Sequence, residues 1–143
     1  MGKKKSVKPK NRLFSFSRSI DRVSITLRIP QVADNGTVEK VEVEHCFKID
    51  SLFDAMEAYR SALIVPNANG IPTVSQGSAA FALWWETIFE VKNYDLIDVP
   101  DWKEFFKTNP VAREHATQAG DLLANQLGLM QVKLSVPFGK SGS

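Results

Sequence analysis

The feature that most constrains the fold of this chain is a pair of segments in which apolar and polar residues alternate. An Asn-Gly pair lies between the two segments. In residues 23–29 the apolar side chains fall on every second position, with polar residues between them. A period of two is typical of a β-strand that buries one face. Residues 38–47 alternate in the same way, and Asn35-Gly36 is a strong turn signal because both residues tolerate positive φ. We therefore expect an antiparallel hairpin whose first strand ends at Pro30.

The apolar period becomes helical after the second of these segments. Ser51 and Asp54 have the spacing of a capping box, and Asp101 can cap a helix that has Glu104 in its first turn. Asn109-Pro110 is a typical helix start. Gly128 is well placed to end the last helix. We expect helices over residues 51–64, 79–92 and 102–107, and a last helix from Asn109-Pro110 to Gly128. Residues 66–78 hold two prolines, two glycines and two asparagines, and we expect a long loop there.

A further alternating segment near the C-terminus predicts one more strand. Its apolar positions are Met130, Val132, Leu134 and Val136. Strands with one apolar face need a helical layer to cover that face. The fold class that we expect is therefore α+β: a two-layer domain in which an antiparallel sheet, made of the N-terminal hairpin plus the C-terminal strand, packs on about three helices. The last strand could instead add to the sheet of another subunit. In this interpretation residues 1–12 are a disordered basic arm, 13–136 a single α+β domain, and 137–143 a flexible tail.

The charge of the chain is divided unevenly along its length. Nine of the eighteen Lys and Arg residues, but only one acidic residue, lie in residues 1–28. This basic segment predicts contact with a polyanion, with a protein partner, or with nothing specific as a solubilising tail. Aromatic residues among basic ones suit single-stranded nucleic acid, where bases stack on rings. The residues that would bind nucleic acid are Lys3, Lys4, Lys5, Lys8, Lys10, Arg12, Phe14, Phe16, Arg18 and Arg22.

Candidate catalytic chemistry is sparse. Cys46 is the only cysteine, and His45 beside it should point to the opposite face of a strand, so the two cannot easily act together. His115 lies on the apolar side of its helix, where a hydrogen-bonded role at the edge of the core is the simpler interpretation. We find no phosphate-binding, dinucleotide or metal-ligand spacing. We therefore expect a non-enzymatic protein with no catalytic residues, no cofactor and no metal.

The location that we expect is cytoplasmic. A single cysteine fits a reducing compartment. No run of about 18 apolar residues is present, so we expect no contact with a membrane.

The helix expected over residues 79–92 is apolar on more than one side, which favours burial against a partner. We expect a homo-oligomer. The interface residues that we expect are Trp84, Trp85, Met130, Val132 and Leu134.

The segment WWETIFEVKNYDLIDVPDWKEFF, residues 84–106, followed by a closing helix, resembles the tail assembly chaperones of long-tailed bacteriophages and other small phage morphogenesis proteins. The resemblance implies a non-enzymatic protein that binds a tail subunit or measures a tail during assembly. If the protein is viral, the location that we expect is the host cytoplasm or the virion. Two other functions stay open: a nucleic-acid-binding protein that uses the basic segment, and an enzyme.

Overall fold

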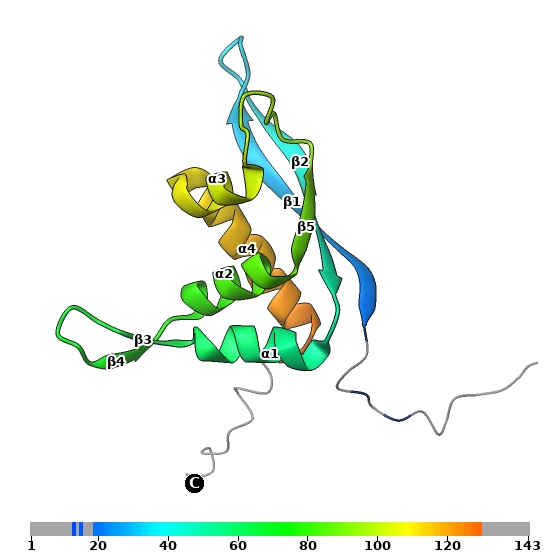
Figure 1. Cartoon of the computed structure of the whole chain (residues 1–143). Coiled ribbons are helices and arrows are strands. Elements are labelled where there is room, and N and C mark those ends of the chain that lie inside the picture. The colour runs from blue at the N-terminus through cyan, green and yellow to red at the C-terminus, as the bar shows by residue number, and fades with distance from the viewer. Residues whose placement is uncertain (1–12, 14, 16–18, 130–143) are drawn as a thin grey trace, which may run out of the picture.

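The computed structural model describes residues 13, 15 and 19–129, and the expected basic arm, C-terminal strand and tail lie outside these residues. Strand β1 (Ile20–Val32) pairs antiparallel with β2 (Val38–Ile49), so that Arg28 lies opposite Glu42 (Figure 1). Gly36 in the connecting turn has a φ of 87°. The expected hairpin is confirmed, although its first strand continues past Pro30.

The third strand of the sheet is β5 (Ile88–Lys92), which pairs antiparallel with the other edge of β2. The prediction of a helix through residue 92 is wrong for these five residues, because α2 (Gln76–Thr87) ends one residue earlier than β5 begins. Ile88, the C-cap of α2, already has extended angles of φ −70° and ψ 136°. Ile88 and Val91 are β-branched, and pairing with β2 satisfies their backbone groups.

Three further helices follow the sequence signals closely. Helix α1 (Leu52–Ser61) starts after Ser51, whose hydroxyl accepts a hydrogen bond from the Asp54 backbone N–H. Helix α3 (Trp102–Thr108) is capped by Asp101, and α4 (Pro110–Gln126) is capped by Asn109. These short-range caps are confirmed as expected.

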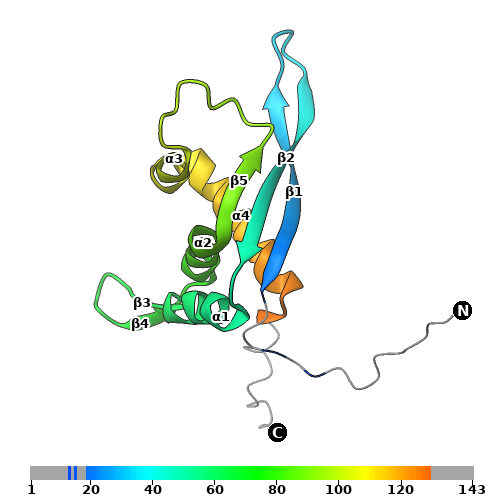
Figure 2. The ribbon, with the colours of Figure 1, turned by 45° about the vertical axis from the view of Figure 1, so that its right-hand side comes forward.

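Helices and sheet form two layers around one core (Figures 1 and 2). Val43 and Phe47 of β2 face the helices, whereas Thr26 and Arg28 of β1 lie on the solvent side of the sheet. The α+β class with an antiparallel sheet is confirmed. Within the described residues, β5 supplies the third strand of that sheet and four helices are present. The largest fully buried side chains are Trp84, Tyr59, Phe47, Phe106, Ile49, Leu83, Leu123 and His45.

Candidate functional site

A second, smaller hairpin projects from the body of the molecule. Strand β3 (Ile64–Pro66) pairs antiparallel with β4 (Pro72–Val74), between α1 and α2. Both ribbon views show it extending away from the helices (Figures 1 and 2). Residues 66–78 were expected to be a loop without regular structure, and that expectation is wrong for β4 and for the first residues of α2.

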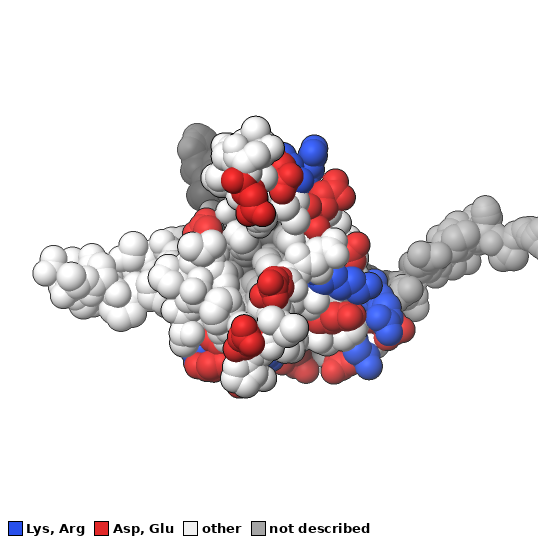
Figure 3. Space-filling view, turned by 90° about the horizontal axis from the view of Figure 1, so that it is seen from above, with Lys and Arg blue, Asp and Glu red and all other residues white. Residues whose placement is uncertain are grey.

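The projecting hairpin is apolar and carries no charge. No Lys, Arg, Asp or Glu occurs between Arg60 and Glu86. The side chains of Ile64, Ile71 and Val74 are 51%, 56% and 54% exposed. In Figure 3 the lobe at the left is white, whereas red atoms are scattered over the middle of the visible face and blue atoms gather toward its right. Exposed apolar side chains that are grouped on a projection are typical of a protein contact surface.

The backbone of this hairpin alternates between paired and outward-facing groups. The Asn67 N–H donates to the Ile71 carbonyl oxygen at 2.9 Å, and the Ser75 N–H donates to the Leu63 carbonyl oxygen at 2.7 Å. Hydrogen-bonded and non-hydrogen-bonded pairs alternate along an antiparallel ladder. The hydrogen-bonded pairs of residues therefore have odd numbers. The residues at even-numbered positions between them point their backbone N–H and C=O groups toward the outer edges of the hairpin.

Proline occupies one of these outward positions on each strand. The outward pairs are Ile64 with Val74 and Pro66 with Pro72. Proline has no N–H, so each outer edge lacks a donor that an added strand would need. All four side chains share one face of the hairpin because the two pairs are two residues apart. The edges thus resist strand addition, and the apolar face remains as the contact surface.

A chain of hydrogen bonds between side chains joins the sheet, α2 and α4 through the core. The Trp84 Nε1–H donates to His45 Nδ1 at 2.8 Å, and His45 Nε2 lies 2.8 Å from the Tyr94 hydroxyl. That hydroxyl lies 3.1 Å from His115 Nδ1. His45 is fully buried, whereas Tyr94 and His115 are half-buried. The expected hydrogen-bonded role of His115 at the edge of the core is confirmed.

Burial keeps the titratable side chains of this hydrogen-bond chain neutral at pH 7. Burial, with a smaller contribution from the nearby His115, lowers the pKa of His45 from 6.5 to about 4. Burial also lowers the pKa of His115, although Glu114 opposes the shift. The pKa of Tyr94 is raised above its usual range by burial. The four groups therefore satisfy one another as neutral donors and acceptors.

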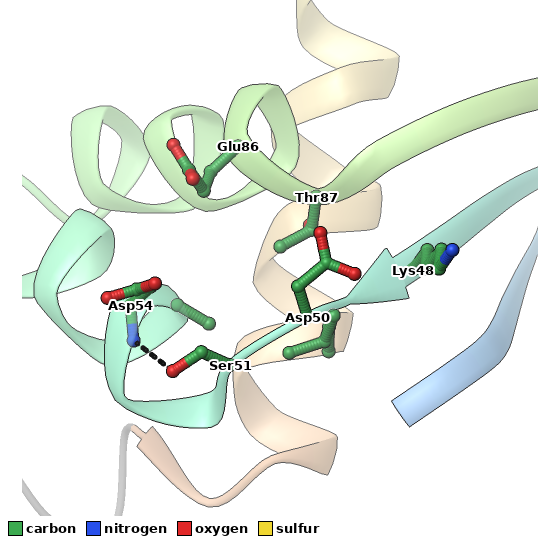
Figure 4. Close-up of a pocket in the computed structure, with 8 residues that line it drawn as sticks. Lys48, Asp50, Ser51, Asp54, Glu86 and Thr87 are labelled. Carbon is green, nitrogen blue, oxygen red and sulfur yellow. Dashed lines mark hydrogen bonds between the residues drawn. The ribbon is translucent and has the colours of Figure 1, made fainter. Parts of the chain in front are cut away.

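The other chemical groups that the sequence singled out do not come together. Cys46 is buried on the opposite side of the sheet from His45, with its Sγ 3.9 Å from a Glu44 carboxylate oxygen. A cavity of about 90 Å³ lies where β2 leads into α1, and its lining includes the carboxylates of Asp50 and Glu86 (Figure 4). Within residues 19–129, no three His, Cys, Asp or Glu side chains group in a way that could hold a metal ion.

Of the expected nucleic-acid-binding residues, the structure describes only Arg22. Lys3, Lys4, Lys5, Lys8, Lys10, Arg12, Phe14, Phe16 and Arg18 lie outside the described residues. Arg22 is exposed on β1, and its guanidinium carbon lies 5.1 Å from the centre of the Phe89 ring. This arginine therefore has a cation–π partner within its own chain.

The expected interface residues are separated by the fold. Trp84 is fully buried, stacked between the rings of Phe81 and Phe106, so it has no surface to offer a partner. The fold corrects the expectation for Trp84, because its indole N–H serves the hydrogen-bond chain instead. Trp85 is half-buried, and the Nζ atoms of Lys103 and Lys107 lie 4.5 Å and 5.1 Å from the centre of its ring. Met130, Val132 and Leu134 lie outside the described residues.

Sequence reasoning did not single out the projecting hairpin or Tyr94. The signal for the hairpin was present: Asn69-Gly70 lies between two short apolar segments within a stretch of 25 residues that has no charge. Tyr94 carries no local signal, because its partners are 49 and 21 residues away.

Comparison of the chain with protein-family models, with curated proteins and with solved structures gives no match. In the part of the chain that the structure describes, no helix is long and apolar enough to cross a membrane.

Proposed function

We propose that this protein is a non-enzymatic assembly protein that associates with further copies of itself through the β3–β4 hairpin. The observation that carries the proposal is the exposed, charge-free face formed by Ile64, Pro66, Pro72 and Val74. Desolvating this face on contact requires no ion to lose its water, so apolar burial is not offset by a charge penalty.

A second copy is the partner that this face fits best. In a contact with twofold symmetry, each residue meets residues of the same patch on the other copy. A charged patch would place like charges together, but the hairpin face has no charge to repel its copy. Because proline blocks both outer edges, the two hairpins would pack face to face instead of extending one sheet.

The setting that we propose is virus assembly. The resemblance of residues 84–106 to phage tail assembly chaperones supports this setting, and it would place the protein in the host cytoplasm or the virion. Small proteins of this kind act by binding other subunits. The hairpin suits that role because it extends away from the helices (Figures 1 and 2).

The test compares the mass in solution of the native chain and of two double variants. Ile64→Thr with Val74→Thr keeps β-branched side chains in the hairpin but adds hydroxyl groups to its contact face. The matched control is Val32→Thr with Val38→Thr, a cross-strand pair that is 67% exposed at both positions but lies at the far end of β1 and β2.

Light scattering after size-exclusion chromatography at tens of micromolar should show an oligomer for the native chain and for the control. The hairpin variant should shift to the mass of a monomer with unchanged circular dichroism. A native chain that is strictly monomeric, or a hairpin variant that keeps the oligomer, would overturn the proposal.

A second candidate function is nucleic-acid binding, which the charge division favours. Residues 29–143 carry nine basic and fifteen acidic residues, so a polyanion would be attracted to the N-terminal segment alone.

A further inference from the structure

The hydrogen-bond chain has one internally consistent direction. The indole N–H of Trp84 can only donate, so Nδ1 of His45 must be an acceptor and the proton of this neutral ring lies on Nε2. His45 therefore donates to the Tyr94 oxygen, and the Tyr94 O–H donates to Nδ1 of His115. The last acceptor of the chain is thus a nitrogen that can bind a proton.

We propose that these hydrogen bonds act as a proton-sensitive latch: protonation of His115 at Nδ1 releases residues 93–101 from the core. A proton on Nδ1 turns the acceptor of the Tyr94 O–H into a donor. The hydroxyl can accept from both histidines, but its own hydrogen then has no partner. An unpaired buried hydroxyl is costly, and Tyr94 regains a partner if it moves out toward water.

The segment that would move is held to the sheet at few points. It connects β5 to α3 and contains no regular secondary structure. The Asn93 side-chain amide donates to the Glu42 carbonyl oxygen at 2.9 Å, and Leu96 packs partly against the core. Ile97 is 87% exposed. Loss of the Tyr94 contact would thus remove the polar link between this segment and α4.

Solvent can reach His115 without opening the core. Its ring lines a groove of about 470 Å³ between β1 and the start of α4, whose rim carries Arg28 and Glu114. The titratable and charged groups facing His115 are therefore His45 from β2, Tyr94 from the connecting segment and Glu114 from α4 itself. Arg28 of β1 borders the groove, but its guanidinium pairs with Glu42 on the solvent side of the sheet. A charged His45 opposes protonation of His115, and Glu114 favours it.

The sign of the pH effect follows from the lowered pKa values of both histidines. The unfolded chain takes up protons near pH 6.5, where the folded chain does not. Stability is therefore complete above pH 6.5 and falls as the pH drops toward about 4. For His45 alone, a shift from 6.5 to about 4 corresponds to a change of about 300-fold in the folding equilibrium constant.

The test follows both histidines and the connecting segment by nuclear magnetic resonance between pH 7.5 and pH 4. The chain has only two histidines, so His115→Asn identifies both ring resonances. In the native protein both rings should titrate below 6.5, and the amide resonances of residues 94–99 should shift with the titration of His115. In His115→Asn the amide oxygen still accepts from Tyr94 but cannot be protonated at this pH, so that shift should disappear.

Tyr94→Phe serves as a second variant that keeps the ring and removes the link. His115 should then titrate closer to 6.5, because a donor that stabilised its neutral form is gone, and the segment should no longer follow it. The latch is overturned if His115 in the native protein titrates at or above 6.5, or if the segment shifts in the same way in His115→Asn.

Discussion

The contact between α2 and α4 predicts that a single methyl group at Gly120 will destabilise the fold. Gly120 is buried on α4 where this helix meets α2. A Cβ added there would overlap the carbonyl oxygen of Ala80 and would lie 2.9 Å from its carbonyl carbon. It would also lie 3.2 Å from Cβ of Trp84. Two of these atoms belong to the backbone of α2, so a rotamer change cannot relieve the contact.

The expected cost combines two opposing effects. Alanine favours a helix over glycine by up to about 1 kcal/mol. Overpacking in a core costs about 1–3 kcal/mol or more, and moving two packed helices apart by about 1 Å forfeits up to about half of their local dispersion energy. The overlap is with backbone atoms, so the cost should lie at the upper end of this range, and after the gain in helix propensity we expect Gly120→Ala to lower the free energy of unfolding by about 1–3 kcal/mol.

Gly77→Ala is the matched control on the facing helix. A Cβ added at Gly77 meets only Cγ2 of Thr117, at 3.9 Å, which is an ordinary contact. This variant should gain up to about 1 kcal/mol from helix propensity. The free energy of unfolding of both variants is measured by urea denaturation, monitored by circular dichroism. If the dependence of this free energy on urea concentration is unchanged, only stability has changed. If Gly120→Ala is as stable as the native chain while Gly77→Ala behaves as expected, the close approach of α2 and α4 is refuted.

Two further predictions concern the core and the basic segment. Trp84→Phe removes the donor to His45 Nδ1 and should cost about 1–3 kcal/mol beyond the lost ring volume, as measured by urea unfolding; a cost explained by volume alone would contradict the hydrogen bond. Removing residues 1–12 deletes six basic residues. If the segment makes about four phosphate contacts on duplex DNA, the logarithm of the binding constant of the full chain should fall with the logarithm of salt at a slope of about −3 to −4. Binding that the truncation leaves intact would refute this function.

Local sequence signals predicted those parts of the fold whose causes are local. The Asn35-Gly36 turn is confirmed because its backbone needs a positive φ at Gly36, which has one of 87°. The caps at Ser51, Asp101 and Asn109 are confirmed because each side chain bonds to a backbone N–H within three residues. The α+β class followed from the change of apolar period along the chain.

The tertiary structure decided what depends on distant neighbours. Residues 88–92 continue an apolar helical pattern, yet they form β5 because β2 offers a strand edge to pair with. The hydrogen-bond chain joins residues 21, 39 and 49 positions apart, so only the packing of sheet and helices brings its four side chains together. The same packing buries Trp84 and leaves Ile64 and Val74 exposed. Strand β5, the hydrogen-bond chain, the burial of Trp84 and the exposure of Ile64 and Val74 all depend on which surfaces meet in space. The local apolar pattern does not determine those contacts.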